Sequence, residues 1–425
     1  MPRLIYTLVV MLLLPWAVLH LLWRARRQQE YLRHWGERFA RYDAAPSGRP
    51  TIWLHAVSVG ETRAAQPLVA ALRQRHPDHR ILFTHMTPTG RVTSEALYGD
   101  SVERIYLPYD TPWAMRRFLR HFRPRLGLIM ETELWPNLIA ACREEAVPLL
   151  LLNARLSERS ARRYAKFPAL SGEALRGLAA VGAQSIDDAS RLQALGAANV
   201  AITGNLKFDI EAATRQLELG AELRRRHGPR ASFLAASTRE GEEALILDAW
   251  RRAPRRIAAP DGSETAALLV IVPRHPQRFA DVARLARERG FCVQLRSEDR
   301  EVDAATEILV GDSMGEMFAY YASVDLAFIG GSLLDFGSQN LIEAAACGTP
   351  ILIGPSTHNF AEAARAALDC GAARRIVDAD DLAGQALELL QDETARAAMG
   401  RAGRDFAARH RGATARTMAL IPEAC

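Results

Sequence analysis

Short apolar runs alternate with helical segments along most of this chain, and that alternation limits the folds it can adopt. Between the runs, apolar residues recur at helical spacing, as at Ala65, Leu68, Val69 and Leu72. Two series of predicted strands result: 52–57, 81–84, 104–107, 126–130, 149–153, 179–182 and 200–203, then 232–236, 267–272, 292–295, 308–310, 324–329 and 351–353. Repeated βα units predict an α/β fold with doubly wound parallel sheets.

Residues 204–219 break the alternation, and we predict that they link two Rossmann-like domains, because 425 residues exceed one ordinary core. The expected domains are 25–208 and 209–425, and the last helix of the second is a candidate to pack back on the first. Ligands of such sheets bind at the carboxyl ends of the strands. The sequence therefore predicts an interdomain cleft.

Residues 4–23 are apolar apart from Thr7 and His20, and 20 helical residues span roughly 30 Å, enough to cross a hydrocarbon core. Four arginines follow this segment (Arg24, Arg26, Arg27 and Arg33), whereas only Arg3 precedes it. The positive-inside rule then places the rest of the chain in the cytoplasm. A cleaved signal peptide is the alternative, but no small-residue cleavage site follows. We predict an uncleaved membrane anchor over residues 1–24.

Composition excludes several classes of protein. The 54 basic and 49 acidic residues leave a formal charge of only +5, and no dense basic run is interleaved with aromatics, so nucleic acid is a poor candidate partner. The five scattered cysteines form neither a disulfide framework nor a metal-ligand spacing. Basic residues are nearly all arginine or histidine. The two lysines, Lys166 and Lys207, either occur by chance in an arginine-rich sequence or mark places where a compact ammonium group is needed.

A glycine-rich stretch over residues 328–360 has the pattern of a ligand site. Strand 324–329 leads into Gly330, Gly331 and Gly337, where backbone can approach a ligand. Asn340 is then a predicted N-cap for a helix through residue 347, with Glu343 completing a capping box, and strand 350–353 follows. This order is typical of sheets that bind phosphate-bearing ligands. The alternative is a capped helix after a tight turn, with no ligand.

Acidic residues follow two predicted strands of the first domain. Strand 52–57 runs through Ser58 and Gly60 to Glu61 at a helix start, where the carboxylate is either a general base or a first-turn residue favoured by the helix dipole. Strand 126–130 ends in Glu131 and Glu133, which alternation places on the same side of an extended chain. Carboxylates at such an edge need partners: a cation, a sugar hydroxyl or another protein group.

Basic and small residues follow other strands. Lys207 lies where the two domains meet in this interpretation. Residues 237–243 form a predicted N-cap segment with Arg239, and Arg274 follows the next strand, so the two arginines could flank a phosphate or be surface charges. Residues 315–317 begin a predicted short helix whose amides could meet a base or ribose.

Metal sites are poorly supported. Asp378-Ala379-Asp380 has the DxD pattern of metal-dependent sugar transferases, but it precedes a helix start, where capping is the better interpretation. No histidine pair has zincin spacing. We predict no metal.

Six segments, 55–61, 131–137, 204–209, 273–276, 315–317 and 330–360, together resemble the 3-deoxy-D-manno-octulosonic acid (Kdo) transferases, in order and over nearly the whole chain. The resemblance implies a glycosyltransferase B-type fold, with two Rossmann-like domains and a deep cleft. It implies an inverting transfer of Kdo from CMP-Kdo to the lipid A precursor, lipid IVA, in lipopolysaccharide biosynthesis. The implied location is the cytoplasmic face of the bacterial inner membrane, against phospholipid, and no metal or other cofactor is implied.

The resemblance also assigns residues. Glu61 corresponds to the catalytic base, and Glu131 and Lys207 to groups that stabilise the transition state. The CMP-binding segments correspond to Pro273, Arg274, Gly315, Glu316, Met317, Asn340, Leu341, Ile342 and Glu343. Secondary candidates are Ser58, Gly60, Glu133, Ser237, Arg239, Gly331 and Ser332.

The chain departs from the family pattern at two places. Gly337-Ser338-Gln339-Asn340 stands where Gly-Gly-His-Asn is frequent, and glutamine cannot be cationic. Ala236 stands where glycine is frequent before Ser237.

Two other functions stay open: a membrane-anchored two-domain transferase that uses a UDP-sugar, and a non-catalytic nucleotide-binding module. Turnover with UDP-sugars but not with CMP-Kdo would indicate the first function. A chain that binds nucleotide without turnover, and does so without Glu61 or Lys207, would indicate the second.

Overall fold

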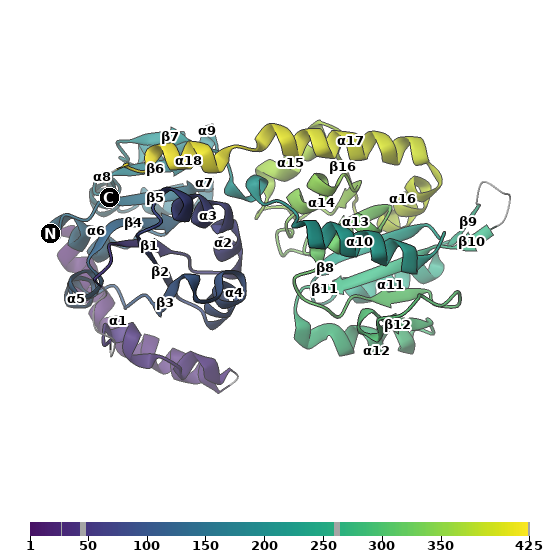
Figure 1. Ribbon diagram of the computed structural model, residues 1–425, viewed down its shortest axis with the longest axis horizontal. Helices are drawn as coiled ribbons and strands as arrows, with labels where there is room; N and C mark the ends of the chain where they lie inside the picture. Colours follow the sequence, from purple (N-terminus) through teal and green to yellow (C-terminus); the bar gives the residue numbers. More distant parts are fainter. Residues whose placement is uncertain (27, 43–47, 259–263, 424–425) are drawn as a thin grey trace. The chain divides into compact units, whose positions relative to one another are not determined.

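The computed structural model describes residues 1–26, 28–42, 48–258 and 264–423. Arg27 and Cys425, considered above, lie outside these ranges. The chain divides into two compact units (Figure 1): unit 1 is Met1–Ile210 with Arg411–Cys425, and unit 2 is Glu211–His410. The predicted division at 208/209 left the C-terminal residues in the second domain, whereas here they belong to unit 1.

Unit 1 is built on a seven-stranded parallel sheet in the order β3-β2-β1-β4-β5-β6-β7. Its strands are β1 (Thr51–His55), β2 (Arg80–His85), β3 (Glu103–Tyr106), β4 (Pro124–Met130), β5 (Leu149–Ala154), β6 (Ala180–Ala183) and β7 (Val200–Ile202). Its helices are α1 (Pro2–Ala25), η1 (Gln29–Leu32), η2 (Trp35–Phe39), α2 (Val59–Ala64), α3 (Gln66–Arg75), α4 (Pro88–Tyr98), η3 (Gly99–Ser101), α5 (Pro112–Phe122), α6 (Pro136–Glu144), α7 (Glu158–Tyr164), α8 (Pro168–Arg176), α9 (Ile186–Ala194), η4 (Leu206–Asp209) and α18 (Ala413–Leu420). Along β1, Ile52 and Leu54 join one buried apolar cluster and Trp53 joins another, so helices cover both faces of the sheet.

Unit 2 repeats this architecture with the order β12-β13-β11-β8-β14-β15-β16. Its strands are β8 (Ser232–Thr238), β11 (Leu268–Pro273), β12 (Val293–Leu295), β13 (Ile308–Val310), β14 (Leu326–Ile329), β15 (Ile351–Ile353) and β16 (Ala373–Arg375), with a separate antiparallel pair β9 (Arg256–Ala258) and β10 (Glu264–Ala266). Its helices are α10 (Thr214–His227), α11 (Glu242–Arg252), η5 (Pro276–Arg278), α12 (Phe279–Glu288), η6 (Arg296–Glu298), α13 (Met317–Ser323), α14 (Ile342–Cys347), α15 (Ala361–Asp369), α16 (Ala379–Gln391) and α17 (Glu393–His410).

Every predicted strand is present, with its ends moved by at most two residues, and the prediction of doubly wound parallel sheets is confirmed. Strands β9, β10 and β16 were missed, because each is three residues long and contains charged residues, so none forms an apolar run. The predicted linker 204–219 is wrong in extent, because η4 occupies its first part and α10 begins at Thr214.

One predicted helix start is wrong. Helix α14 begins at Ile342 with Leu341 as its N-cap, so Asn340 is not the cap. Helix α11 begins at Glu242 with Gly241 (φ +94°) as its N-cap, which lies inside the predicted N-cap segment 237–243.

The last residues return to unit 1. Helix α18 contacts α3, β6 and η4. The Arg75 guanidinium donates to the carbonyl of Met418 at 2.8 Å, and Asp209 Oδ1 accepts from the Gly412 amide at 2.7 Å. These bonds attach the end of the chain to the same sheet that holds its first strands.

The approach of β15 to the loop after β14 gives a test of packing in unit 2. A Cβ added to Gly354 would lie 2.3 Å from the carbonyl oxygen of Ser332, which belongs to the glycine loop. Gly354→Ala should therefore lower the free energy of unfolding by about 1–3 kcal/mol, measured by chemical denaturation. The matched control is Gly384→Ala in α16, where nothing lies within 4 Å of the added atom and a gain of about 0.5–1 kcal/mol is expected. Equal effects of the two changes would contradict this account of the loop.

Candidate functional site

Glu61 lies in the first turn of α2, directly after the carboxyl end of β1. Its side chain is buried, with 7% exposure, and each carboxylate oxygen accepts one local hydrogen bond. Ser58 Oγ donates to Oε1 and the Val57 amide donates to Oε2, both at 2.7 Å. These two bonds fix the orientation of the carboxylate and leave each oxygen able to accept a further hydrogen bond.

Two further carboxylates surround Glu61. Burial, followed by the negative charges of Glu131 and Glu133, raises the pKa of Glu61 to about 7, although the hydrogen bonds from Ser58 and Val57 oppose the shift. Burial and Glu131 likewise raise the pKa of Glu133 to about 7. A carboxyl group with a pKa near neutrality can exchange a proton at physiological pH, which a general base requires.

Glu131 is paired with a cation. Its Oε1 lies 3.2 Å from Lys207 Nζ, and both side chains are largely buried. Lys207 is positioned by η4, where Asn205 Oδ1 accepts from the Lys207 amide at 3.0 Å. Sequence reasoning placed Glu131 and Glu133 on the same side of an extended chain, and that reason is wrong. Glu131 adopts φ +57°, and β4 ends before it. The structure nevertheless brings Glu61, Glu131, Glu133 and Lys207 together.

In unit 2 a buried glutamate that sequence reasoning missed organises the glycine loop. Glu242 is fully buried, and its Oε2 accepts from the amides of Gly331 (2.7 Å) and Arg239 (2.8 Å). Its Oε1 accepts from the Leu333 amide at 3.0 Å. Residue 330 must be glycine, because an added Cβ would lie 2.6 Å from the Ser237 carbonyl oxygen. The only sequence signal was a carboxylate in the first turn of a helix.

Arginines gather at the ends of β8 and β11. Arg239 Nη1 lies 3.1 Å from His275 Nε2, and Arg274 Nε donates to Gln339 Oε1 at 3.1 Å. Burial lowers the pKa of His275, and the charges of Arg239, Arg274 and Arg278 lower it further. This concentration of positive charge suits a phosphate.

One of the two departures from the resembled family, at Ser338 and Gln339, falls at this place. Gln339 is uncharged, and its carbonyl accepts from Arg274, which a protonated histidine could not do. Ser338 adopts φ +72°, a conformation that favours glycine, where the family often has glycine.

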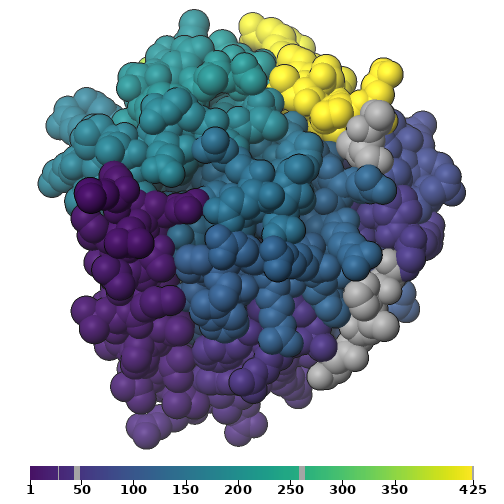
Figure 2. Space-filling model, turned by 90° about the vertical axis from the view of Figure 1, so that its left-hand side faces the viewer, coloured from purple at the N-terminus to yellow at the C-terminus, as the bar shows by residue number. Residues whose placement is uncertain are grey.

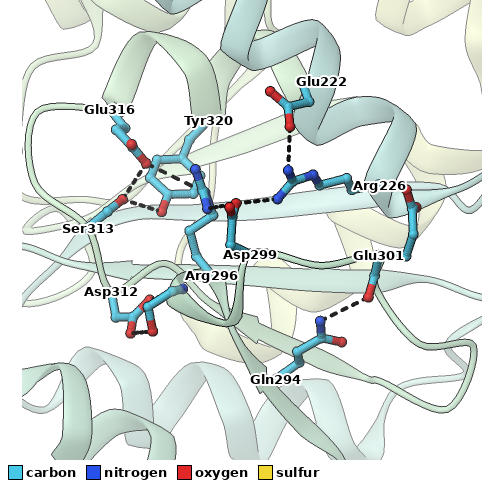
Figure 3. A network of polar contacts seen from close by, with 11 residues as sticks. Glu222, Arg226, Gln294, Arg296, Asp299, Glu301, Asp312, Ser313, Glu316 and Tyr320 are labelled. Carbon is cyan, nitrogen blue, oxygen red and sulfur yellow. Dashed lines mark hydrogen bonds and ion pairs between the residues drawn. The ribbon is translucent and has the colours of Figure 1, made fainter.

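The candidate segment 315–317 belongs to a polar network (Figure 3). Ser313 Oγ donates to Glu316 Oε2 at 2.6 Å and shares a 2.7 Å bond with Tyr320, while Arg296 approaches the same carboxylate at 3.6 Å. Asp299 joins Arg296 to Arg226 on α10. Ser237 Oγ contacts Met317 Sδ at 3.8 Å, so two predicted site segments meet here. The Glu316 side chain is thus occupied within the protein, and a ligand would meet the backbone of this turn.

The remaining candidates have structural partners. Asn340 Oδ1 accepts from the Ile342 amide and its Nδ2 donates to Glu343 Oε1, both at 3.0 Å. Leu341 and Ile342 are buried, so only their backbones could meet a ligand. Ser332 is buried and its Oγ accepts from the Gly354 amide at 2.8 Å.

Among the residues that the structure describes, no three His, Cys, Asp or Glu side chains group so as to hold a metal ion. Asp378 caps α16 by accepting from the Asp381 amide at 2.9 Å, which confirms the capping interpretation of the DxD run.

Comparison with known proteins places this architecture in a class. A family model described as "Glycosyl transferases group 1" matches residues 264–406. Solved structures that resemble the chain include a UDP-GlcNAc 2-epimerase from Neisseria meningitidis (TM-score 0.57, 13% identity, covering 87% of this chain and 99% of that one) and MurG from Acinetobacter baumannii (0.54, 14%, 88% and 99%). With its two parallel sheets, the chain is a glycosyltransferase of the B type.

A second family model and two full-length relatives identify the family within this class. A model described as "3-Deoxy-D-manno-octulosonic-acid transferase (kdotransferase)" matches residues 33–210. The chain is 43% identical to the 3-deoxy-D-manno-octulosonic acid transferase of Bordetella pertussis, covering 100% of this chain and 99% of that one, and 35% identical to that of Haemophilus influenzae, covering 99% and 98%. The chain belongs to the Kdo transferase family.

The environment of Glu61 predicts a measurable pH dependence. A base must be deprotonated, so the rate should fall as the pH drops through a pKa near 7. Glu133→Gln removes a negative charge that raises this pKa, and the acid limb of kcat/KM should therefore move to lower pH. The control, Glu95→Gln on the exposed surface of α4, should leave the limb unmoved. If the acid limb of Glu133→Gln stays where it is in the wild type, the charge of Glu133 does not influence the pKa of the base.

Replacing Ser58 should move the acid limb of the kcat/KM profile in the opposite direction. Its hydroxyl stabilises the ionised form of Glu61, so Ser58→Ala should raise the pKa and move the acid limb to higher pH. Ser58 is also the N-cap of α2, and Ser157 caps α7 in the same way. Ser157→Ala is therefore the matched control, which should lose similar stability but keep the wild-type profile.

Proposed function

We propose that this Kdo transferase moves Kdo from CMP-Kdo to the lipid A precursor, lipid IVA, with inversion at the anomeric carbon. The observation that carries the proposal is Glu61, a buried carboxyl with a pKa near 7 beside two carboxylates and a paired lysine. The full-length similarity to two proteins named as Kdo transferases supports the choice of sugar.

In the proposed reaction, Glu61 takes the proton from an acceptor hydroxyl as that oxygen attacks the anomeric carbon of Kdo. The bond from that carbon to the cytidylate oxygen breaks, and CMP leaves with the electron pair. One base beside one hydroxyl suffices for this single displacement, which inverts the configuration. Lys207, held against Glu131, supplies positive charge toward the carboxylate of Kdo as negative charge shifts to the leaving group.

Unit 2 is proposed to hold the cytidylate. Arg239 and Arg274 lie at neighbouring strand ends and would bind the phosphate. The turn at Gly315–Met317 would present its backbone to the base, and Asn340–Glu343 would meet the ribose or the phosphate. These cationic and amide groups offer the leaving group charge compensation without a metal ion, which is why we propose a metal-independent transfer.

The proposed location is the cytoplasmic face of the inner membrane, with α1 as the anchor. By length and composition α1 could cross a membrane, as a signal sequence also could. The arginines after it favour anionic phospholipid headgroups. The acceptor is itself a lipid, so an anchored enzyme meets it at the bilayer surface.

The decisive experiment compares Glu61→Gln with the wild type. Glutamine keeps the size of the side chain but cannot take a proton, so kcat should fall about 10²–10⁴-fold. Turnover is measured with purified protein, CMP-Kdo and lipid IVA, and products are counted by mass. CMP affinity, measured by calorimetry, should stay near the wild-type value because the proposed CMP segments lie in unit 2.

The same assay with Glu95→Gln controls for loss of any surface carboxylate in unit 1. Wild-type turnover by Glu61→Gln would reject the base, and turnover with UDP-sugars but not with CMP-Kdo would reject the donor.

A further inference from the structure

Helix α1 turns one face toward its own unit along its whole length. Its less exposed residues recur every three or four positions: Pro2, Arg3, Tyr6, Thr7, Val10, Leu14, Ala17, Val18, Leu21 and Ala25. This spacing traces a single stripe on an α-helix. The helix contacts α6 and α8 in unit 1, as well as the following η1, and Figure 2 shows its residues (dark purple) against the blue surface of unit 1. A helix that stood free in a bilayer would show no such stripe.

Polar bonds hold the first turns of α1 to unit 1. Tyr6 OH donates to Asp110 Oδ2 at 2.9 Å, and Thr7 Oγ1 donates to Asn137 Oδ1 at 2.9 Å. Asp110 is buried and also accepts from the Leu138 amide at 2.8 Å, at the start of α6. We call Tyr6, Thr7, Asp110 and Asn137 the polar latch.

The chain beyond α1 is held by the same part of unit 1. Glu37 Oε2 accepts from the Tyr106 amide at 2.8 Å, and the Arg38 guanidinium lies 3.9 Å from the centre of the Tyr106 ring. Tyr106 and Asp110 are four positions apart, which is about 14 Å at full extension. The hydrocarbon core of a bilayer is roughly 30 Å thick. The two flanks of α1 therefore cannot lie on opposite sides of a membrane while both contacts hold.

The outer face of α1 is apolar apart from His20. Its exposed large side chains are Leu4, Ile5, Leu8, Val9, Met11, Leu12, Leu13, Trp16, Leu19, Leu22 and Trp23. No charged residue lies between Arg3 and Arg24, so arginine marks both ends of this face. Trp16, His20 and Trp23 stack at 5.3 and 5.7 Å, and tryptophan is enriched where membrane meets water. Lipid is the occupant that matches this composition, with acyl chains along the face and anionic headgroups at the arginines.

We infer that α1 lies in the plane of the cytoplasmic leaflet, with both ends on the same side of the membrane, and that the polar latch holds it there. This inference rests on the proposed membrane location but not on the proposed reaction. The latch binds the start of α6, and the loop that carries Glu131 and Glu133 runs directly into that helix. The latch thus orients the candidate site relative to the lipid surface.

Topology is tested by labelling single cysteines in the full chain, with the native cysteines replaced by serine. Pro2→Cys reports the start of α1, and the control Arg41→Cys reports an exposed residue after it. An impermeant maleimide should label both in inside-out membrane vesicles and neither in right-side-out vesicles. Labelling of Pro2→Cys only in right-side-out vesicles would show a crossing helix and overturn the inference. A mature chain that lacks α1 by mass would overturn it too.

The depth of α1 in the bilayer is tested by fluorescence quenching. Single cysteines that replace Leu4, Leu8, Leu12 or Leu19 carry the fluorophore, and phosphatidylethanolamine–phosphatidylglycerol vesicles carry the quenchers on their lipids. A helix in the plane gives similar depths at all four positions, whereas a crossing helix is deepest at Leu12. Absence of quenching together with a stable dimer would mean that a second copy covers the face, and would also overturn the inference.

The latch has its own test in the membrane-bound protein. A bis-maleimide should join Thr7→Cys to Asn137→Cys, whereas Val9→Cys with Asn137→Cys is the control from the exposed face. Equal yields would contradict the latch. None of these measurements uses transfer activity, so a failure of the proposed reaction leaves them interpretable.

Discussion

The ion pair between Lys207 and Glu131 is the contact on which the candidate site of unit 1 depends. Three carboxylates at one edge of a sheet repel each other, and burial penalises each negative charge. Lys207 compensates one of them at 3.2 Å. The remaining cost is borne by Glu61 and Glu133, whose pKa values both rise to about 7. Burial and the neighbouring negative charges thus leave a carboxyl group able to exchange a proton near neutral pH.

Unit 2 has the same type of fold, but positively charged side chains gather at its strand ends. Its buried carboxylate, Glu242, is satisfied by backbone amides and shapes a loop, while Arg239, Arg274 and Arg278 surround His275. The candidate site of unit 1 therefore gathers carboxyl groups, whereas the strand ends of unit 2 gather cations.

Helix α1 shows how far sequence can be trusted for a membrane segment. Its apolar length and flanking arginines indicate a bilayer but do not separate a crossing helix from one that lies on the surface. Tyr6 and Thr7 are inconspicuous in an apolar run. Their partners, Asp110 and Asn137, are more than a hundred positions away, and only packing brings them together.

The sequence by itself determined the βα alternation and, to within two residues, every strand of the two seven-stranded sheets except β16, because apolar periodicity acts locally. It also placed Glu61, Glu131, Lys207 and Arg274 at or beyond the ends of predicted strands. It did not determine the start of α14, the left-handed conformation of Glu131, or the role of Glu242. Each depends on hydrogen bonds or burial supplied by distant residues, such as the Gly331 amide that binds Glu242. Tertiary structure alone decided which charges meet and which amides are satisfied, since desolvation and pairing are properties of the packed chain.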